Sequence, residues 1–325
     1  MSMLWEVRMD RSVIFMFSGQ GSQYYGMGRE LYRLNSVFRK WMTKLDEIHT
    51  DITGRSVLKM LYDDNRGRGD VFDSLLYTHP AIFMVEYALT QVLLEKGIYP
   101  DYILGSSLGE FASVAVAGCM SYEDTLQCLV KQAQMVENYC PKGGMLAVIG
   151  DLSLYDQISV LNASSELASI NYDSHFVISG SCEELEKIER YLIANEIICQ
   201  RLPVQFAFHS SLMDPIALKY TAFLKLKTLR NPTINMVSSM FGGKATSLDN
   251  RFLWDVARKP IRFRNALKCL GDGEGIIYID LGPSGTLANF VKYNFGIKKM
   301  ASICSILSPF QNDMKNLDRL FEIFD

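Results

Sequence analysis

The sequence lacks the markers of several protein classes. No apolar run approaches the roughly 18 uninterrupted residues of a membrane-spanning helix. The seven cysteines include no C-x-x-C pair, which argues against metal binding and favours reduced thiols in a cytoplasm. Acidic residues ahead of the first apolar run are the wrong layout for a secretory signal. With a formal net charge of −3, we expect a cytoplasmic protein that binds no metal, no nucleic acid and no membrane.

The chain also lacks the motifs of a nucleotide-binding enzyme. A glycine-rich loop at residues 18–23 follows a strand-like run at 13–17, but the pattern G-x-G-x-x-G fails at Tyr24. The pattern G-x-x-x-x-G-K-[ST] does not occur. A glycine-rich loop after a strand can still present backbone N–H groups to a developing negative charge.

A serine on a sharp turn is the strongest catalytic signal that is present. Residues 105–109 read G-S-S-L-G and fit G-x-S-x-G, in which Ser107 occupies a strained turn between a strand and a helix. Gly105 and Gly109 lack the Cβ atoms that would collide where the strand and the helix almost touch. The alternative is an ordinary tight turn between a strand and a helix.

A serine nucleophile needs a base, and histidine is the usual one at neutral pH. The chain has only four histidines. We interpret His49, His79 and His175 as surface or structural residues. His209 follows the last strand of an inserted unit, where the chain returns to the serine turn, and is the candidate base.

The order of predicted elements indicates an α/β fold in two parts. Strand-like runs lie at 13–17, 102–104, 234–238 and 276–281. Helical patterns alternate with them: one at 27–49, one that starts at 78–80, and one from 286. A further helix is predicted from the capping box of Ser121 and Asp124 to about residue 139. Strands at 144–149, 167–171, 175–179 and 197–206 and helices at 151–163 and 182–195 form a ferredoxin-like order. We predict a large subdomain from residues 1–142 and 207–325, with residues 143–206 inserted as a small one.

Six sequence blocks resemble, in order, the signatures of malonyl-CoA:acyl carrier protein transacylases, the acyltransferase domains of fatty acid and polyketide synthases. They are FSGQGSQYYGMG at 17–28, THPA at 78–81, GSSLGE at 105–110, INYDSHFVISG at 170–180, FAFH at 206–209 and DLGPSG at 280–285. The blocks span nearly the whole chain. The resemblance implies an α/β-hydrolase-like large subdomain with a parallel sheet and an inserted ferredoxin-like small subdomain, in agreement with the predicted order.

The resemblance also assigns roles. It makes Ser107 the nucleophile and His209 the base, and it places the oxyanion hole at the backbone N–H groups of Gln20 and Leu108. It implies that Asn171 is a polar group near His209, whose second ring nitrogen is held by a carbonyl within residues 259–263. Phe206 and Phe208 are candidates for an apolar pocket or for the core. The implied substrates are acyl thioesters on the phosphopantetheine of an acyl carrier protein or on coenzyme A, with no bound cofactor.

Two departures from the family pattern bear on the substrate. Relatives that load malonyl groups carry an arginine that binds the free carboxylate, and the matching position here is Gln132. Because an amide cannot form the bidentate charge pair, we expect malonyl to be a poor substrate. Lys131 is the alternative source of charge, although adjacent helix positions point about 100° apart. Ser106 replaces the usual histidine of G-H-S-x-G.

A glutamine in place of that arginine is a mark of the acyl hydrolases of trans-acyltransferase polyketide pathways. The leading hypothesis is therefore an acyl-[acyl carrier protein] thioester hydrolase, which we expect to be a monomer. The alternatives are a transferase of a non-malonyl acyl group and an inactive homologue that binds carrier proteins. A basic run at residues 258–264 is a candidate surface for an acidic carrier protein.

Overall fold

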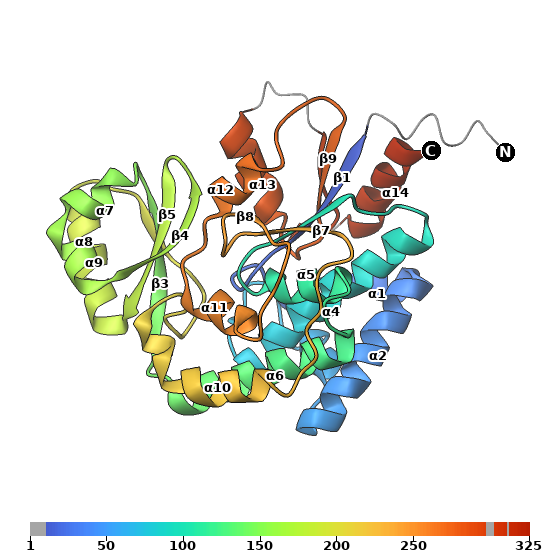
Figure 1. Ribbon diagram of the computed structural model, residues 1–325, viewed down its shortest axis with the longest axis horizontal. Helices are drawn as coiled ribbons and strands as arrows, with labels where there is room; N and C mark the ends of the chain where they lie inside the picture. Colours follow the sequence, from blue (N-terminus) through green and yellow to red (C-terminus); the bar gives the residue numbers. More distant parts are fainter. Residues whose placement is uncertain (1–10, 297–301, 311) are drawn as a thin grey trace.

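The computed structural model describes residues 11–296, 302–310 and 312–325. Its larger sheet has six strands in the order β10-β9-β1-β2-β7-β8 (Figure 1). These strands are β10 Ser302–Ser305, β9 Ile276–Asp280, β1 Ser12–Phe17, β2 Tyr102–Gly105, β7 Asn235–Ser238 and β8 Gly243–Lys244. Neighbours run parallel except β8, which is antiparallel to β7. The prediction of a parallel sheet is confirmed.

Strand β1 is apolar at every position after its first because helices cover both faces of the sheet. Val13, Phe15 and Phe17 pack with α2 (Ser36–Thr53), α4 (Leu75–Glu95), α5 (Gly109–Val116) and α6 (Tyr122–Tyr139). Ile14 and Met16 point the other way and pack with α12 (Phe263–Lys268) and α13 (Thr286–Phe295). The other helices of the large subdomain are α1 Arg29–Leu34, α3 Val57–Leu61, α10 Ala217–Leu224, α11 Phe252–Arg258 and α14 Asp313–Phe324, with a 3-10 turn, η2, at Ser211–Ile216.

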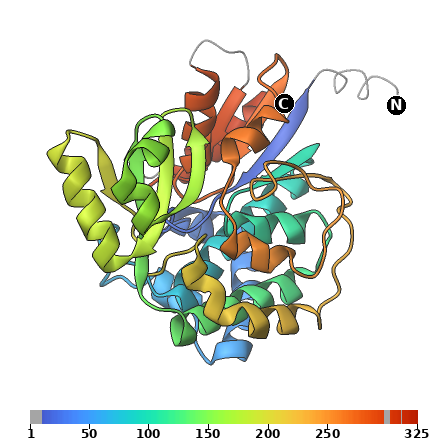
Figure 2. The ribbon, with the colours of Figure 1, turned by 60° about the vertical axis from the view of Figure 1, so that its left-hand side comes forward.

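The smaller sheet is antiparallel, with the order β4-β5-β3-β6. Its elements are β3 Gly143–Ile149, α7 Ser153–Gln157, α8 Ser159–Ser164, β4 Glu166–Tyr172, β5 His175–Ser181, α9 Cys182–Ala194 and β6 Cys199–Arg201. This is the predicted ferredoxin-like unit. Leu146, Val148 and Ile178 pack on one face against its own helices, which lie on its outer side (Figures 1 and 2). Met145 and Val177 on the other face join the core of the large subdomain.

Helix α4 begins earlier than the sequence predicts. It starts at Leu75, whose N–H donates to Glu137 Oε1 of α6 over 2.8 Å, so the expected start at residues 78–80 is wrong. Pro80 therefore lies inside the helix and leaves the carbonyl of Leu76 without its usual N–H partner. His49 Nε2 lies 3.1 Å from that carbonyl oxygen and takes the place of the missing donor. His49 is a buried structural residue.

Two further elements differ from the prediction. The pattern at 27–49 forms two helices, because Asn35 adopts an extended conformation and its side chain accepts from the N–H of Phe38 as the cap of α2. The strand expected at 197–206 ends at Arg201. Pro203, two residues later, has no N–H to donate to a neighbouring strand.

The helices around the serine turn follow the predicted signals. Ser121 Oγ accepts the N–H of Asp124 over 3.1 Å, and α6 runs to Tyr139 as the capping box predicts. The chain passes from α6 into the small sheet and returns to the large subdomain through residues 206–209. No helix within the described ranges combines the length and the apolar character needed to cross a bilayer.

Candidate active site

Ser107 occupies a strained turn between β2 and α5. Its φ is 54°, a left-handed conformation that is uncommon for a residue other than glycine. A Cβ on Gly109 would lie 2.0 Å from the carbonyl oxygen of Phe17, and one on Gly105 would lie 2.5 Å from Ser113 Oγ. The two glycines of the motif therefore allow β1, β2 and α5 to meet, as predicted.

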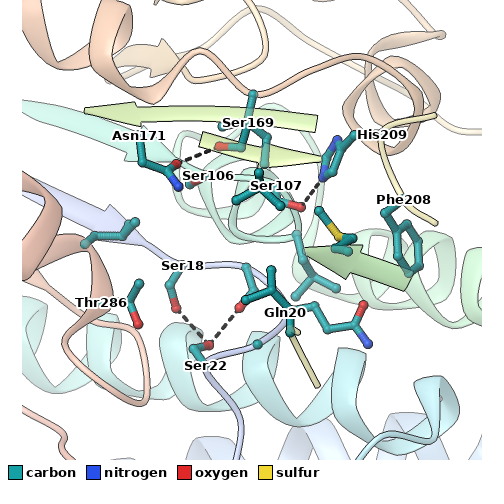
Figure 3. Close-up of a pocket in the computed structure, with 18 of the residues that line it drawn as sticks. Ser18, Gln20, Ser22, Ser106, Ser107, Ser169, Asn171, Phe208, His209 and Thr286 are labelled. Atoms are coloured by element: carbon teal, nitrogen blue, oxygen red, sulfur yellow. Dashed lines mark hydrogen bonds between the residues drawn. The ribbon is translucent and has the colours of Figure 1, made fainter. Parts of the chain in front are cut away.

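His209 faces Ser107 across a short distance. Its Nε2 lies 2.8 Å from Ser107 Oγ, and its Nδ1 lies 2.8 Å from the carbonyl oxygen of Lys259 (Figure 3). The backbone N–H of His209 donates to the carbonyl of Ala257 over 2.8 Å, which fixes a residue whose φ is 63°. With the proton on Nδ1 held by Lys259, Nε2 is free to accept the serine proton. The predicted carbonyl within residues 259–263 is Lys259.

Burial sets the charge of this base. Desolvation lowers the pKa of His209 from 6.5 to about 4, although the hydrogen bond to the Lys259 carbonyl acts in the opposite direction. The imidazole is therefore neutral at neutral pH and ready to take a proton.

The acylation rate of Ser107 should then fall only at acid pH. Because the folded pKa lies below the unfolded value, the neutral base persists as pH falls below 6.5 and is lost near 4. We expect kcat/KM for an acyl-pantetheine thioester to be flat down to about pH 5 and to fall below it. Folding stability should begin to decline earlier, as pH falls from the unfolded value of 6.5 toward the folded value of about 4, since the unfolded chain binds the proton first. A midpoint near the ordinary histidine value in the rate profile would contradict this assignment.

Two backbone N–H groups near Ser107 are available to an oxyanion. Those of Gln20 and Leu108 donate no hydrogen bond to another protein group within the described ranges. Leu108 follows Ser107 directly, and the loop of Gln20 touches the turn, since a Cβ on Gly19 would lie 2.8 Å from Ser107 Cβ. The arrangement suits the oxyanion hole that the sequence predicts, and the pairing with an oxyanion stays a prediction.

A cavity of about 430 Å³ opens over Ser107 and His209. Both subdomains line it: Phe111 and Val256 come from the large one, and Met145 and Val177 from the small sheet. Every residue proposed for the site lines this cavity, namely Gln20, Ser106, Ser107, Leu108, Gln132, Asn171, Phe208 and His209. Figure 3 places Phe208 beside His209. Phe206 is buried and is not among the cavity residues.

Comparison with known proteins identifies the family. The family model described as the acyl transferase domain matches residues 14–324 of this chain. The chain belongs to the acyl transferase domain family. It is 48% identical over 310 residues to the polyketide biosynthesis acyltransferase homolog PksD of Bacillus subtilis (strain 168), covering 95% of this chain and 96% of that protein. It is 46% identical over 312 residues to the homolog BaeD of Bacillus velezensis (strain DSM 23117 / BGSC 10A6 / LMG 26770 / FZB42), covering 96% of each.

A solved structure supports the same assignment for this acyltransferase. A loading acyltransferase from the avermectin modular polyketide synthase superposes with a TM-score of 0.87 at 25% identity, covering 97% of this chain and 100% of that one. The family and the fold together support an enzyme that transfers acyl groups.

Gln132 gives the acyltransferase cavity a neutral floor. It is 2% exposed, and its Nε2 lies 3.4 Å from the carbonyl oxygen of Leu253. Lys131 does not line the cavity, because its Nζ lies over the ring of Phe223, 6.0 Å from the centroid. Among the described lining residues the one cationic side chain is Arg201, whose Nε pairs with Glu189 over 2.9 Å. A carboxylate in the cavity would therefore meet no unpaired cation.

The side chain of Asn171 is bonded within the small sheet, to Ser169 over 2.6 Å and to His175 Nδ1 over 3.0 Å. Asn171 and His209 line the same cavity, and within the described ranges no hydrogen bond joins their side chains. The role of Asn171 beside this base stays a prediction. His175 itself lines the cavity, and burial lowers its pKa. The pair adds neutral polar groups to the wall of the acyltransferase cavity.

Two buried groups near the site escaped the sequence analysis. His79 lines the cavity, and its Nε2 lies 3.3 Å from Gln20 Oε1. Glu86 Oε1 accepts the N–H of Ser18 over 2.6 Å. The THPA block was the one available signal for His79, but we interpreted it as a helix start. Glu86 carried no signal, because a lone acid within an apolar helix has no local motif.

The basic run at 258–264 offers little free charge for docking. Arg258 pairs with Glu166 and Asp214, Lys259 with Asp255, and Arg264 with Asp173. Only Arg262 of the four basic side chains has no ion pair within the described ranges. Solvated ion pairs of this kind contribute little free energy to stability or to binding.

Within the same ranges, no group of three or more His, Cys, Asp or Glu side chains is placed to hold a metal ion.

Proposed function

We propose that this acyltransferase homologue is an acyl-[acyl carrier protein] thioester hydrolase with an editing role in polyketide biosynthesis. The observation that carries the proposal is that Gln132 lines the cavity. The family resemblance matches this position to the arginine of malonyl-loading relatives. A neutral floor suits an acyl group without a carboxylate. The relatives PksD and BaeD, both named as polyketide biosynthesis acyltransferase homologs, support the pathway.

The chemistry would follow from the serine and histidine pair. His209 Nε2 takes the hydroxyl proton while Ser107 Oγ attacks the thioester carbonyl. The oxyanion would be held by the N–H groups of Gln20 and Leu108. Collapse re-forms the carbonyl and breaks the C–S bond, and the departing phosphopantetheine thiolate takes the proton from His209. Water, activated by the same histidine, then releases the acyl group from Ser107.

A second candidate is a transferase in which a carrier-protein thiol, rather than water, accepts the acyl group. The match to the acyl transferase domain over residues 14–324 favours it.

An inactive carrier-binding homologue is the third candidate. The separation of 2.8 Å between Ser107 Oγ and His209 Nε2 favours the active candidates, because it lets the histidine take the serine proton.

The fate of the acyl-serine separates these functions. Acetyl- and butyryl-pantetheine are incubated with the protein, with and without the thiol of a phosphopantetheinylated carrier protein. Free acid released rapidly without the thiol is the expected result. An acyl adduct on Ser107 that persists until the thiol is added would overturn hydrolysis in favour of transfer. A wild-type protein that, like Ser107→Ala, neither gains acyl mass nor releases free acid would establish the inactive homologue.

Gln132→Arg should improve activity toward malonyl thioesters. A guanidinium in this cavity could bind the free carboxylate in bidentate fashion, and such a charge-assisted bond contributes about 1.5–3 kcal/mol. We expect the malonyl-to-acetyl ratio of kcat/KM to rise by about tenfold or more. Gln132→Lys is the matched control, since it adds the charge without the fork and should gain less. An unchanged ratio in Gln132→Arg would show that this position does not face the acyl group.

A further inference from the structure

The loop Ser18–Gln23, here called the glycine loop, carries one of the two proposed oxyanion donors, Gln20, yet belongs to no helix or strand. It lies directly on the serine turn, because a Cβ on Gly19 would lie 2.8 Å from Ser107 Cβ and 3.0 Å from the Ser106 carbonyl oxygen. Any displacement of the loop therefore moves the Gln20 N–H relative to Ser107. Residues that hold this loop can therefore act on the Gln20 N–H through the loop.

Glu86 holds the start of the loop from below. Its Oε1 accepts the backbone N–H of Ser18 over 2.6 Å and lies 3.1 Å from Ser18 Oγ. Ser18 Oγ lies 3.1 Å from Ser22 Oγ, which donates to the carbonyl of Gly19 over 2.7 Å (Figure 3). Glu86 is fully buried, and desolvation raises its pKa well above the ordinary value. Burial thus favours the neutral carboxyl, and the amide of glutamine would keep an oxygen that accepts from Ser18.

His79 holds the middle of the loop. Its Nε2 lies 3.3 Å from Gln20 Oε1, and its ring packs against Phe208 at a centroid distance of 5.5 Å. Burial lowers the pKa of His79 to about 3, so the ring is neutral and donates to Gln20 from Nε2. A glutamine side chain could supply the same donor.

Both supports come from one face of one helix. His79 and Glu86 lie two turns apart on α4, so their side chains project in the same direction. Together they fix the glycine loop at Ser18 and at Gln20, on either side of Gly19. The helix with an internal proline is thus also the platform under the loop.

We propose that His79 and Glu86 are positioning residues that hold the Gln20 N–H where the oxyanion forms during acylation of Ser107. The inference rests on the acyl-serine step of the proposed function and not on whether water or a thiol resolves it. In that step Ser107 Oγ bonds to the carbonyl carbon, the carbonyl electron pair moves onto oxygen, and His209 takes the serine proton. Displacement of the glycine loop would weaken the hydrogen bond to the oxyanion of the transition state, while binding of the neutral thioester would stay unchanged.

The test is the single-turnover rate of Ser107 acylation by butyryl-pantetheine, followed by rapid quench and intact mass. His79→Leu and Glu86→Leu should lower this rate by about tenfold to a hundredfold, with KM changed by less than about threefold. His79→Gln and Glu86→Gln should restore most of the rate, since each amide keeps the hydrogen bond. Butylboronic acid, which forms a tetrahedral adduct with an active serine, should lose affinity in parallel with the rate.

Thr78→Val is the matched control on the same helix. Thr78 is buried next to His79, and its Oγ1 has no hydrogen-bond partner among the described residues. Ser107 of the Thr78→Val variant should be acylated at the wild-type rate. Three results would each overturn the proposal. The first is a wild-type acylation rate in folded His79→Leu and Glu86→Leu, and the second is an equal loss of rate in Thr78→Val. The third is a change in KM without a change in the acylation rate.

Gln20→Ala tests the same contact without altering α4. It removes the partner of His79, so it should slow acylation as His79→Leu does, and the double variant should be no slower than either. Additive losses would overturn the proposed contact. If His79→Leu fails to fold, a wild-type acylation rate in Gln20→Ala would overturn it instead. A wild-type protein that is never acylated would overturn this inference and the proposed function together. A stable acyl adduct would overturn only hydrolysis.

Discussion

Ser107→Ala is expected to abolish the acyl-enzyme. The nucleophile would be replaced by a methyl group, and no other hydroxyl has a hydrogen bond to His209 within the described ranges. Turnover of acyl-pantetheine should fall by about a thousandfold or more. Intact mass after incubation with a short acyl thioester should show only the unmodified chain, whereas the wild-type chain gains the acyl mass at least transiently.

Ser113→Ala provides the control for this experiment. Ser113 lies buried on α5, the helix that follows the turn, and its Oγ has no hydrogen-bond partner among the described residues. The variant loses a serine hydroxyl near the turn but should keep its acyl adduct. An adduct that survives in Ser107→Ala and maps to a different residue would show that the nucleophile has been assigned to the wrong side chain.

Gly109→Ala should have the largest effect on folding. The added Cβ would lie 2.0 Å from the carbonyl oxygen of Phe17 and 2.4 Å from its carbon. That oxygen already accepts the N–H of Ser106 over 2.9 Å, so neither backbone can move without opening the junction of β1 and β2. We expect a loss of about 3 kcal/mol or more in the free energy of unfolding, measured by urea denaturation.

Gly67→Ala is the matched glycine substitution. A Cβ at Gly67 would meet no atom within 4 Å, so the free energy of unfolding should stay within about 0.5 kcal/mol of wild type. Equal urea midpoints for Gly109→Ala and the wild-type protein would show that the close approach at the turn is relieved at little cost.

The general fold and the strained serine turn could be predicted from the sequence because their signals are local, whereas the roles of Ser107 and His209 stay predictions. The apolar run at residues 13–17 and the capping box at Ser121 each lie within a few neighbouring residues. Ser107 is marked by the glycines on either side of it. His209 was identified by its place after the inserted unit and by the family resemblance.

The errors concern contacts between distant segments. The sequence places Pro80 at a helix start, because no local pattern shows that His49 Nε2 lies at the Leu76 carbonyl or that Glu137 accepts at the true start. Nor does the sequence show that the side chain of Asn171 bonds to Ser169 and His175. His79 and Glu86 gain their roles only once α4 lies under the glycine loop. Such roles depend on tertiary packing, which no short pattern encodes.

The small sheet separates the two reacting side chains along the chain. Ser107 is synthesised before β3, whereas His209 follows β6, so the base emerges from the ribosome only after the whole insertion. A nascent or truncated chain that stops inside the insertion holds the nucleophile without its activating partner. The serine and the histidine can therefore meet only in a chain that has been extended past the whole insertion.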